Sequence, residues 1–175
     1  MKKLTFICMA IIATMFFGSC RGPMGPEGPV GPQGNANVAS STVTVYPRDW
    51  YWDNETNTSW RVDIDYAAIN MDIHEYGAVL VYMNDANTWK QLPMTFYYSQ
   101  IDNQGVEQFY SSSLEVSSYQ GGVSIFWTEN DFFDGRIIDT HDFKIVVIAA
   151  GLYKDRQDID YSDYEAVKTA FQLAD

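Results

Sequence analysis

The 175-residue sequence predicts an all-β fold, an antiparallel β-sandwich of about seven strands with a short α-helix at its C-terminus. Three observations support this prediction. Aromatic residues make up 15% of the chain, and the aromatic and β-branched residues that it uses favour strands. Apolar and polar residues alternate in several short segments, as they do in a strand with one buried face. Clusters of Gly, Asn and Asp separate these segments and predict turns.

The first residues predict a targeting segment that precedes the fold. Two lysines are followed by about 14 apolar residues, fewer than the roughly 20 that span a membrane, which is typical of a signal peptide. The stretch FFGSC then places two small residues directly before Cys20, and it resembles the lipobox at which bacterial lipoproteins are cleaved and acylated. We therefore expect a lipoprotein signal peptide over 1–19 and lipidation of Cys20 by acyl chains such as palmitate. An ordinary secretory leader with a chance cysteine is the alternative.

The residues around Cys20 also predict which membrane, and which face of it, holds the lipid anchor. Arg21 stands where an aspartate would favour retention in the inner membrane of Gram-negative bacteria, so we expect an outer-membrane lipoprotein. Cys20 is not followed by an acidic run that would resemble a surface-export signal, which slightly favours the periplasmic face over the cell surface. Cys8 lies in the leader, so the folded part contains no cysteine and no disulfide.

Residues 22–34, GPMGPEGPVGPQG, place glycine at every third position for four triplets. A collagen triple helix needs this spacing, because only glycine fits at its axis. The run is short for cooperative assembly, so we expect first a stiff polyproline spacer that reaches about 40 Å. A stem that forms a weak homotrimer is the alternative, which a shared membrane anchor would assist. We place the lipidated N-terminus and the spacer at 20–41 and the β-sandwich domain at 42–175.

The strands of the predicted sandwich begin at residue 42. Segment 60–66, WRVDIDY, is the clearest strand, because its apolar residues alternate with charged ones. Segment 78–83, AVLVYM, is apolar on both faces and predicts a central strand. The predicted strands are, in chain order, 42–47, 60–66, 78–83, 94–100, 106–117, 122–128 and 143–150.

Two helical segments complete the prediction. Isoleucines four residues apart precede Gly77, which predicts one or two helical turns that end at this glycine. Near the C-terminus, Ser162 and Glu165 have the spacing of a capping box. An apolar stripe at helical spacing follows, formed by Val167, Ala170 and Phe171. This helix should therefore lie on the sandwich, and we expect the whole arrangement to be immunoglobulin-like.

Three segments carry a resemblance to a known group of proteins: GAVLVYMNDANTWKQLP (77–93), FKIVVI (143–148) and YEAVKTAF (164–171). Together with the leader and the Gly-Pro-X triplets, they resemble small, uncharacterised, collagen-like lipoproteins of Bacteroidetes-like bacteria. The resemblance covers essentially the whole chain. Its segments are strand and packing motifs, so it implies a fold and a location but no catalytic residue.

The net charge and the sequence motifs argue against several classes of function. The net charge is −12 and no basic stripe is present, so nucleic acid is a poor partner, because its binding depends on Lys and Arg. The chain carries no nucleophile elbow, phosphate-binding loop or dinucleotide motif. His74 and His141 stand alone and are expected to be solvated turn residues. We therefore expect no enzymatic activity, no cofactor and no metal.

Acidic residues gather in two places. The two groups are Asp131 with Asp134, and Asp155 with Asp158, Asp160 and Asp163. Neither group has the spacing of an EF-hand loop. We expect a solvated acidic face at each, and a calcium site is the alternative.

Trp50, Tyr51 and Trp52 are the strongest candidate site. Three consecutive aromatic residues beside Asp53, Asn54 and Asn57 are typical of a sugar-binding platform, on which the apolar face of a sugar stacks. The alternative is that two of the three belong to the core. Since side chains alternate along a strand, at least one of them must face outward.

Together, these observations predict a non-catalytic, lipid-anchored protein of the cell envelope. It would display a β-sandwich on a short collagen-like stem, as an interaction or structural module. The alternative is a glycan-binding accessory lipoprotein that uses the platform at residues 50–52. The expected partners are the membrane, through the lipid anchor, and an unknown protein or glycan.

Overall fold

The computed structural model describes residues 37–101, 103–130 and 137–174. These residues belong to one compact unit, Gly34–Asp175. The predicted signal peptide, the lipidation site at Cys20 and the Gly-Pro-X triplets lie outside the described residues.

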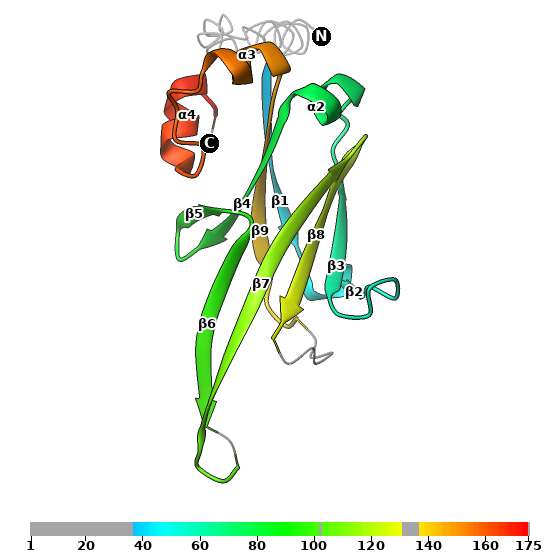
Figure 1. The fold of residues 1–175 in the computed structure, drawn as a ribbon, viewed down its shortest axis with the longest axis vertical. Coiled ribbons are helices and arrows are strands. Elements are labelled where there is room, and N and C mark those ends of the chain that lie inside the picture. Colours follow the sequence, from blue (N-terminus) through cyan, green and yellow to red (C-terminus); the bar gives the residue numbers. More distant parts are fainter. Residues whose placement is uncertain (1–36, 102, 131–136, 175) are drawn as a thin grey trace, which may run out of the picture. The chain divides into compact units, whose positions relative to one another are not determined.

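Two antiparallel sheets and a few short helices form this unit (Figure 1). The four-stranded sheet has the order β1 (Val38–Val45), β9 (His141–Ile148), β4 (Ala78–Asp85) and β5 (Thr88–Gln91). The five-stranded sheet has the order β2 (Tyr51–Trp52), β3 (Trp60–Asp65), β8 (Gly122–Glu129), β7 (Glu107–Tyr119) and β6 (Met94–Ile101). The helices are the 3-10 turn η1 (Pro47–Asp49), α2 (Met71–Tyr76), α3 (Ala150–Asp155) and α4 (Tyr164–Phe171). The all-β prediction is thus confirmed.

All seven predicted strands are present, and two short ones were missed. The two missed strands are β2 and β5, with two and four residues, and segments of this length are too short to show an alternation. β1 begins at Val38, earlier than the predicted residue 42, because Val38 still pairs with Ile148 at the end of β9. The serines that follow, Ser40 and Ser41, are only partly buried, because β1 is an edge strand of its sheet.

The strand order corrects the immunoglobulin-like prediction. In an immunoglobulin domain the fifth and sixth strands lie in different sheets. Here β7 and β8 are the fifth and sixth of the seven predicted strands, and they are neighbours in one sheet. Tyr119 pairs with Gly122, so only Gln120 and Gly121 remain to form the turn between them. Gly121 adopts φ +104°, which glycine allows at little cost. A Cβ on Gly122 would lie 2.5 Å from the carbonyl oxygen of Ile64, so this glycine lets β8 approach β3.

The two sheets share one apolar core, as in a β-sandwich. Strand β3 contributes Val62 and Ile64 at the predicted alternation, and they pack with Ile125 of β8. The opposite sheet contributes Val81 and Ile145 to the same cluster. Each of these side chains is buried, and burial of such a residue stabilises the fold by about 1.5–3 kcal/mol.

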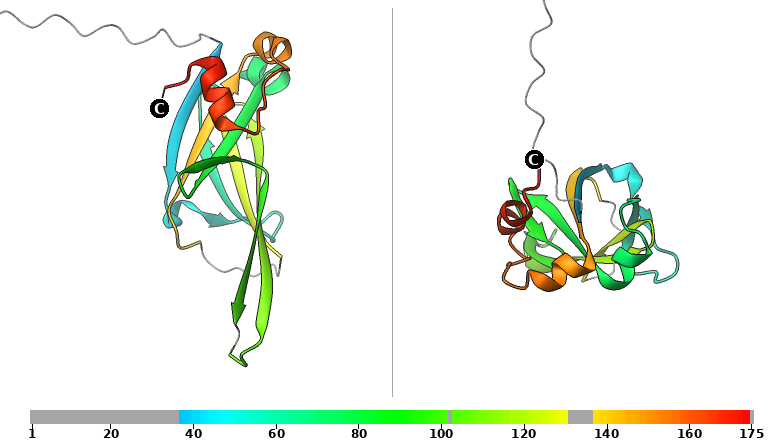
Figure 2. Two further views of the ribbon diagram at one scale, coloured as in Figure 1. Left: turned by 90° about the vertical axis from the view of Figure 1, so that its left-hand side faces the viewer. Right: turned by 90° about the horizontal axis from the view of Figure 1, so that it is seen from above.

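A second apolar cluster covers the outer face of the four-stranded sheet. Leu80 and Tyr82 of β4 and Val146 of β9 pack there against Val167 and Phe171 of α4. β4 lies between β9 and β5 and is buried on both faces, so the prediction of a central strand at 78–83 is confirmed. The helical stripe at the C-terminus also packs on the sheet as predicted (Figure 2).

The helix caps agree only in part with the sequence prediction. α4 is capped by Asp163, whose carboxylate accepts a hydrogen bond from the amide of Glu165 at 2.9 Å. Ser162 was predicted to be the cap, but its hydroxyl donates to Asp160 at 2.6 Å. α2 ends at Gly77 as predicted, although this glycine has an ordinary φ of −87°. A Cβ there would lie 2.5 Å from the carbonyl oxygen of Ile148, so close packing selects the glycine.

The two histidines lie in different surroundings. His74 is exposed on α2, within a short helix and not in a turn. His141 begins β9 and is half-buried, with its ring 5.1 Å from that of Trp127. Burial lowers the pKa of His141. The expectation that both are solvated turn residues is therefore wrong for His141, because strand pairing carries it into the end of the core.

Candidate functional site

Two surfaces of the described domain are candidates for function: the aromatic corner around β2 and the far end of the β6–β7 hairpin. The corner contains the predicted platform. Trp50 is only 5% exposed and packs edge-on against Trp127 and Phe143, with ring centroids 6.1 and 6.3 Å apart. It lies in the core that the two sheets share, so little of its ring is open for stacking. Of the three predicted platform residues, Trp50 is therefore excluded, and Tyr51 and Trp52 remain candidates.

Tyr51 and Trp52 form β2, which pairs with β3 so that Tyr51 opposes Arg61 and Trp52 opposes Trp60. Tyr51 is 44% exposed on the outer face of the sheet. Trp52 is half-buried, packs edge-on against Trp60 at 5.6 Å, and donates from its indole nitrogen to Asn57 at 2.9 Å. The expectation that at least one aromatic residue of the three faces outward is confirmed.

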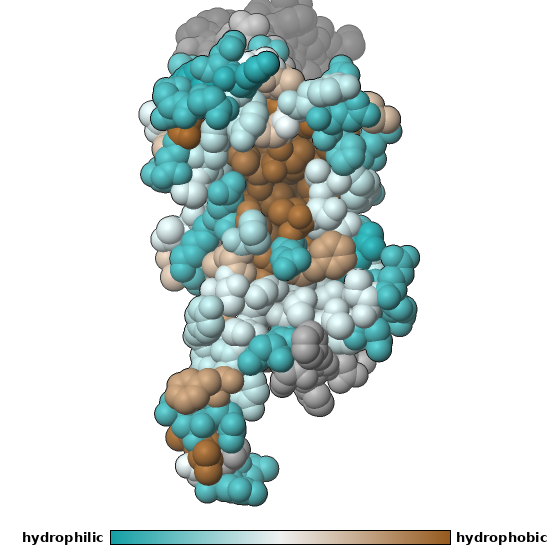
Figure 3. Space-filling view, in the orientation of Figure 1, coloured by the Kyte–Doolittle hydropathy of each residue, from teal (hydrophilic) through white to brown (hydrophobic). Residues whose placement is uncertain are grey.

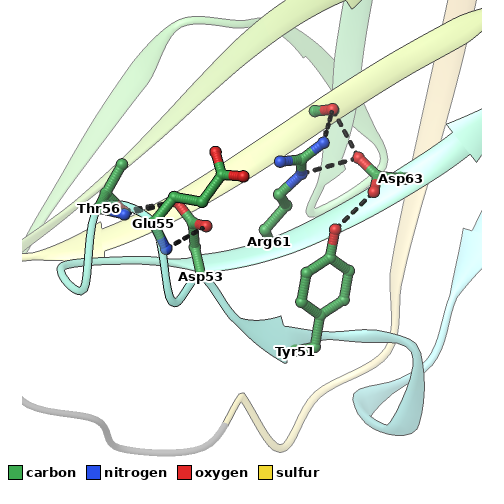
Figure 4. A network of polar contacts seen from close by, with 7 residues as sticks. Tyr51, Asp53, Glu55, Thr56, Arg61 and Asp63 are labelled. Carbon is green, nitrogen blue, oxygen red and sulfur yellow. Dashed lines mark hydrogen bonds and ion pairs between the residues drawn. The ribbon is translucent and has the colours of Figure 1, made fainter.

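Asp63 holds the outer face of this corner together (Figure 4). Its carboxylate accepts hydrogen bonds from the Tyr51 hydroxyl at 2.5 Å, from Arg61 Nε at 2.9 Å and from the Ser124 hydroxyl at 2.5 Å. Arg61 also donates to Ser124 at 3.1 Å. Three strands, β2, β3 and β8, are therefore joined by one set of side-chain contacts on their solvent face.

Burial and hydrogen bonding shift the pKa values of Asp63 and Tyr51 at this corner. Partial burial opposes ionisation of Asp63, but the hydrogen bonds from Ser124, Tyr51 and Arg61 outweigh it and lower its pKa. Burial, together with the hydrogen bond to Asp63, raises the pKa of Tyr51 to about 12. Asp63 thus stays ionised and Tyr51 stays protonated. The hydrogen bond to Asp63 therefore fixes the Tyr51 ring in place.

The loop after β2 is closed by Asp53, which is buried. Its carboxylate accepts a hydrogen bond from the Thr56 hydroxyl at 2.6 Å and another from the amide of Glu55 at 3.2 Å. These contacts, led by the one from Thr56, lower the pKa of Asp53. A pocket lies at the same corner, lined by Pro47, Arg48, Trp50, Trp60 and Ile137. The corner thus combines a fixed exposed ring, a partly exposed indole and a small hollow.

The second surface is the distal hairpin, which we define as residues 97–101 of β6 and 107–111 of β7. β7 pairs with β8 only from Ser112 to Tyr119, whereas its pairing with β6 continues to Glu107. Figure 1 shows that this hairpin extends beyond the other strands. Among the residues described, the distal hairpin is therefore a ribbon of two strands.

Large apolar side chains are exposed on one face of the distal hairpin. Tyr97 is 84% exposed, and Ile101 and Phe109 are each 75% exposed. They share a face because Tyr97 opposes Ser111, Ser99 opposes Phe109, and Ile101 opposes Glu107. Figure 3 shows apolar residues at this end of the molecule. On the opposite face Tyr98 stacks on Tyr110 at 5.6 Å, so the ribbon carries aromatic residues on both sides.

Sequence reasoning placed the two strands of this hairpin but missed the exposed surface. The segments MTFYYSQI and EQFY do not show a clean alternation, because aromatic residues occupy both faces. That pattern was the available signal, since a half-buried strand would keep its aromatic residues on one side.

The acidic cluster near the last helix is divided among local contacts. Asp158 pairs with Arg156, Asp160 accepts from Ser162, and Asp163 caps α4. Within the described ranges, no three His, Cys, Asp or Glu side chains gather as ligands of a metal would. Asp131 and Asp134 lie outside these ranges. No helix in the described part of the chain is both long and apolar enough to cross a membrane.

Comparisons of the chain with protein-family models, with curated proteins and with solved structures found no match.

Proposed function

We propose that this chain is a non-catalytic, lipid-anchored protein of the cell envelope, which displays a β-sandwich as an interaction module on a short collagen-like stem. The observation that carries the proposal is the distal hairpin, whose Tyr97, Ile101 and Phe109 are all at least 75% exposed. Soluble domains seldom expose neighbouring large apolar residues without a partner for them. Tyr and Phe are also among the residues that contribute most to protein interfaces.

The position of the hairpin within the domain supports this role. The chain enters the domain at Val38, which pairs with Ile148 beside α3, and the hairpin turn lies at the opposite end of the sheets (Figure 1). The point at which a stem would join the sandwich is therefore separated from the hairpin turn by the length of the sheets (Figure 1). The sequence of the first 20 residues supports the anchor, through lipidation of Cys20. Arg21 favours the outer membrane, and the lack of an acidic run after Cys20 slightly favours its periplasmic face.

Site-specific photo-crosslinking in cells tests the interaction role. A photoreactive amino acid at Phe109 should give a discrete protein adduct, and the same group at Tyr76 should not. Tyr76 is a matched control because it is 67% exposed and lies on α2, at the other end of the domain. If Phe109 gives no adduct, or the same adducts as Tyr76, the hairpin is not the interaction surface. Labelling with radioactive palmitate, which Cys20→Ala should abolish, tests the anchor separately.

Glycan binding at the aromatic corner is the second candidate function. The observation that favours it is the exposed ring of Tyr51, held by Asp63 beside a half-buried Trp52. On a glycan array, Tyr51→Ala and Trp52→Ala should each abolish binding, whereas Tyr76→Ala should not. Binding that survives both substitutions would exclude this surface.

A further inference from the structure

We infer that β6, the free edge of the five-stranded sheet, pairs in antiparallel fashion with β6 of a second copy of this chain. The inference rests on the proposed interaction role of the distal hairpin and names its partner. Two copies of the ribbon would then form one continuous four-stranded sheet that joins the two sandwiches.

β6 is an unprotected edge. It is the last strand in its sheet, and among the described residues it pairs with β7 alone. Natural proteins protect an edge with lysine, with proline, with a bulge or by keeping the strand short. β6 has eight residues, MTFYYSQI, with neither a charge nor a proline.

The other edges of the two sheets differ from β6. β2 has only two residues, and β5 has four, among which Lys90 forms an ion pair with Asp85. β1 is as long as β6 and also uncharged, but it carries no large exposed hydrophobic residue. β6 alone combines length, lack of charge and exposed apolar side chains, namely those of Tyr97 and Ile101.

The distal hairpin gains stability from an added strand. A two-stranded ribbon is marginally stable in water, and three or more strands with an apolar face are needed for independent stability. Here Tyr97, Ile101 and Phe109 form an apolar stripe on one face, with no third strand beside it among the described residues. A strand added to β6 supplies main-chain hydrogen bonds and covers part of this stripe.

Charge and symmetry favour a second copy as the added strand. The chain carries a net charge of −12, so two copies repel each other wherever charged surfaces meet. β6 is the long uncharged edge at which they can meet without like charges facing each other. An antiparallel pair is also self-complementary, because a two-fold axis presents the same surface on both copies. The Tyr97 side chain of each copy then lies beside the exposed stripe of the other, and the sandwiches lie at opposite ends of the paired strands.

Cysteine scanning tests the pairing directly. In full chains purified in detergent, single cysteines at Thr95, Tyr97, Ser99 and Ile101, all exposed on one face of β6, sample the proposed contact. We expect disulfide-linked dimers at one position or two adjacent positions of the scan, because only residues near a two-fold axis meet their own copy. The unaltered chain gives the background from any thiol that processing leaves at Cys8 or Cys20, and Tyr76→Cys reports random collisions.

Sedimentation of the same full chains measures how strongly they associate. Tyr97→Lys should weaken self-association by roughly tenfold or more, because it places two like charges at the contact and removes two apolar side chains. Tyr76→Lys adds the same charge away from β6 and should leave association unchanged. Circular dichroism of both variants verifies that the sandwich remains folded.

The outcomes of these experiments either support or overturn pairing between two copies of β6. Cross-linking confined to β6, together with weaker association of Tyr97→Lys, supports it. A monomer, equal cross-linking at Tyr76→Cys, or an oligomer that is insensitive to Tyr97→Lys overturns it. A hairpin that cross-links in cells only to a different protein overturns self-pairing but retains the proposed function, whereas a hairpin without any adduct overturns both.

Discussion

Replacement of Trp50 by alanine tests whether this residue belongs to the core or to a binding surface. The indole is buried between the sheets and touches the rings of Trp127 and Phe143. Removal of a buried Trp or Phe side chain costs about 3–5 kcal/mol, because apolar contact is lost and a cavity remains. Edge-on aromatic pairs add about 0.5–1.5 kcal/mol beyond the buried area, so we expect Trp50→Ala to fall in the upper half of that range.

Tyr51→Ala is the matched control, because it changes the neighbouring aromatic residue on the solvent face. It removes an exposed ring and one hydrogen bond to Asp63, which should cost about 1–2 kcal/mol. The two substitutions lie next to each other in the chain, so the difference between them reports which way each side chain points.

Urea unfolding of the full chain, followed by far-ultraviolet circular dichroism, measures both free energies. A domain of this kind has a free energy of unfolding of about 5–15 kcal/mol, so Trp50→Ala can approach complete unfolding. Trp50→Phe provides a milder variant that keeps an aromatic ring in the cavity and should remain folded. If Trp50→Ala costs no more than Tyr51→Ala, Trp50 is not a core residue and our description of the corner is wrong.

Three further predictions concern other contacts. The pKa of Asp63 is lower in the folded chain than in the unfolded one. Its stabilising effect is therefore complete above about pH 4 and is lost as the pH falls through the folded pKa. Asp63→Asn should reduce this loss of unfolding free energy at acid pH, as measured by urea titrations at several pH values. Gly122→Ala should lower the free energy of unfolding by at least about 2 kcal/mol in urea titrations, because the added Cβ would meet the carbonyl oxygen of Ile64. A loss below about 0.5 kcal/mol would contradict the close approach of the two strands. The buried Lys144 donates a hydrogen bond to the hydroxyl of Tyr164 at 2.9 Å. Tyr164→Phe should therefore lower the free energy of unfolding by about 2 kcal/mol in the same assay. An unchanged urea midpoint would show that Lys144 does not need this acceptor.

Local pattern predicted the strands well, because alternation is a property of each strand by itself. Segment 60–66 shows one buried face in the sequence and in the structure, and 78–83 is buried on both faces as its composition indicates. The strand order depends instead on which turns are tight. The turn at Gln120 and Gly121 keeps β8 beside β7, and this connection is one of the pairings that differ from the immunoglobulin order.

The candidate site was predicted only in part, for a related reason. Trp50, Tyr51 and Trp52 are consecutive, and β2 covers only the last two, so no alternation exists to show which ring is buried. The contacts of Tyr51 come from Asp63, twelve residues away, and Asp63 is also bonded to Ser124 of β8. Such contacts follow from sheet pairing, which the sequence does not show directly.

Strand β7 gives the hairpin a mechanical connection to the core. Its 13 residues form one side of the distal hairpin and then continue between β6 and β8 through the sandwich. A tensile force applied at the hairpin tip and at Val38 would run along the strands, so the β7–β8 and β1–β9 ladders would be loaded in shear. In shear, many hydrogen bonds share the load at once, whereas in peeling they break one after another. The direction between Val38 and the hairpin tip is thus the one in which the ladders of the domain resist force best.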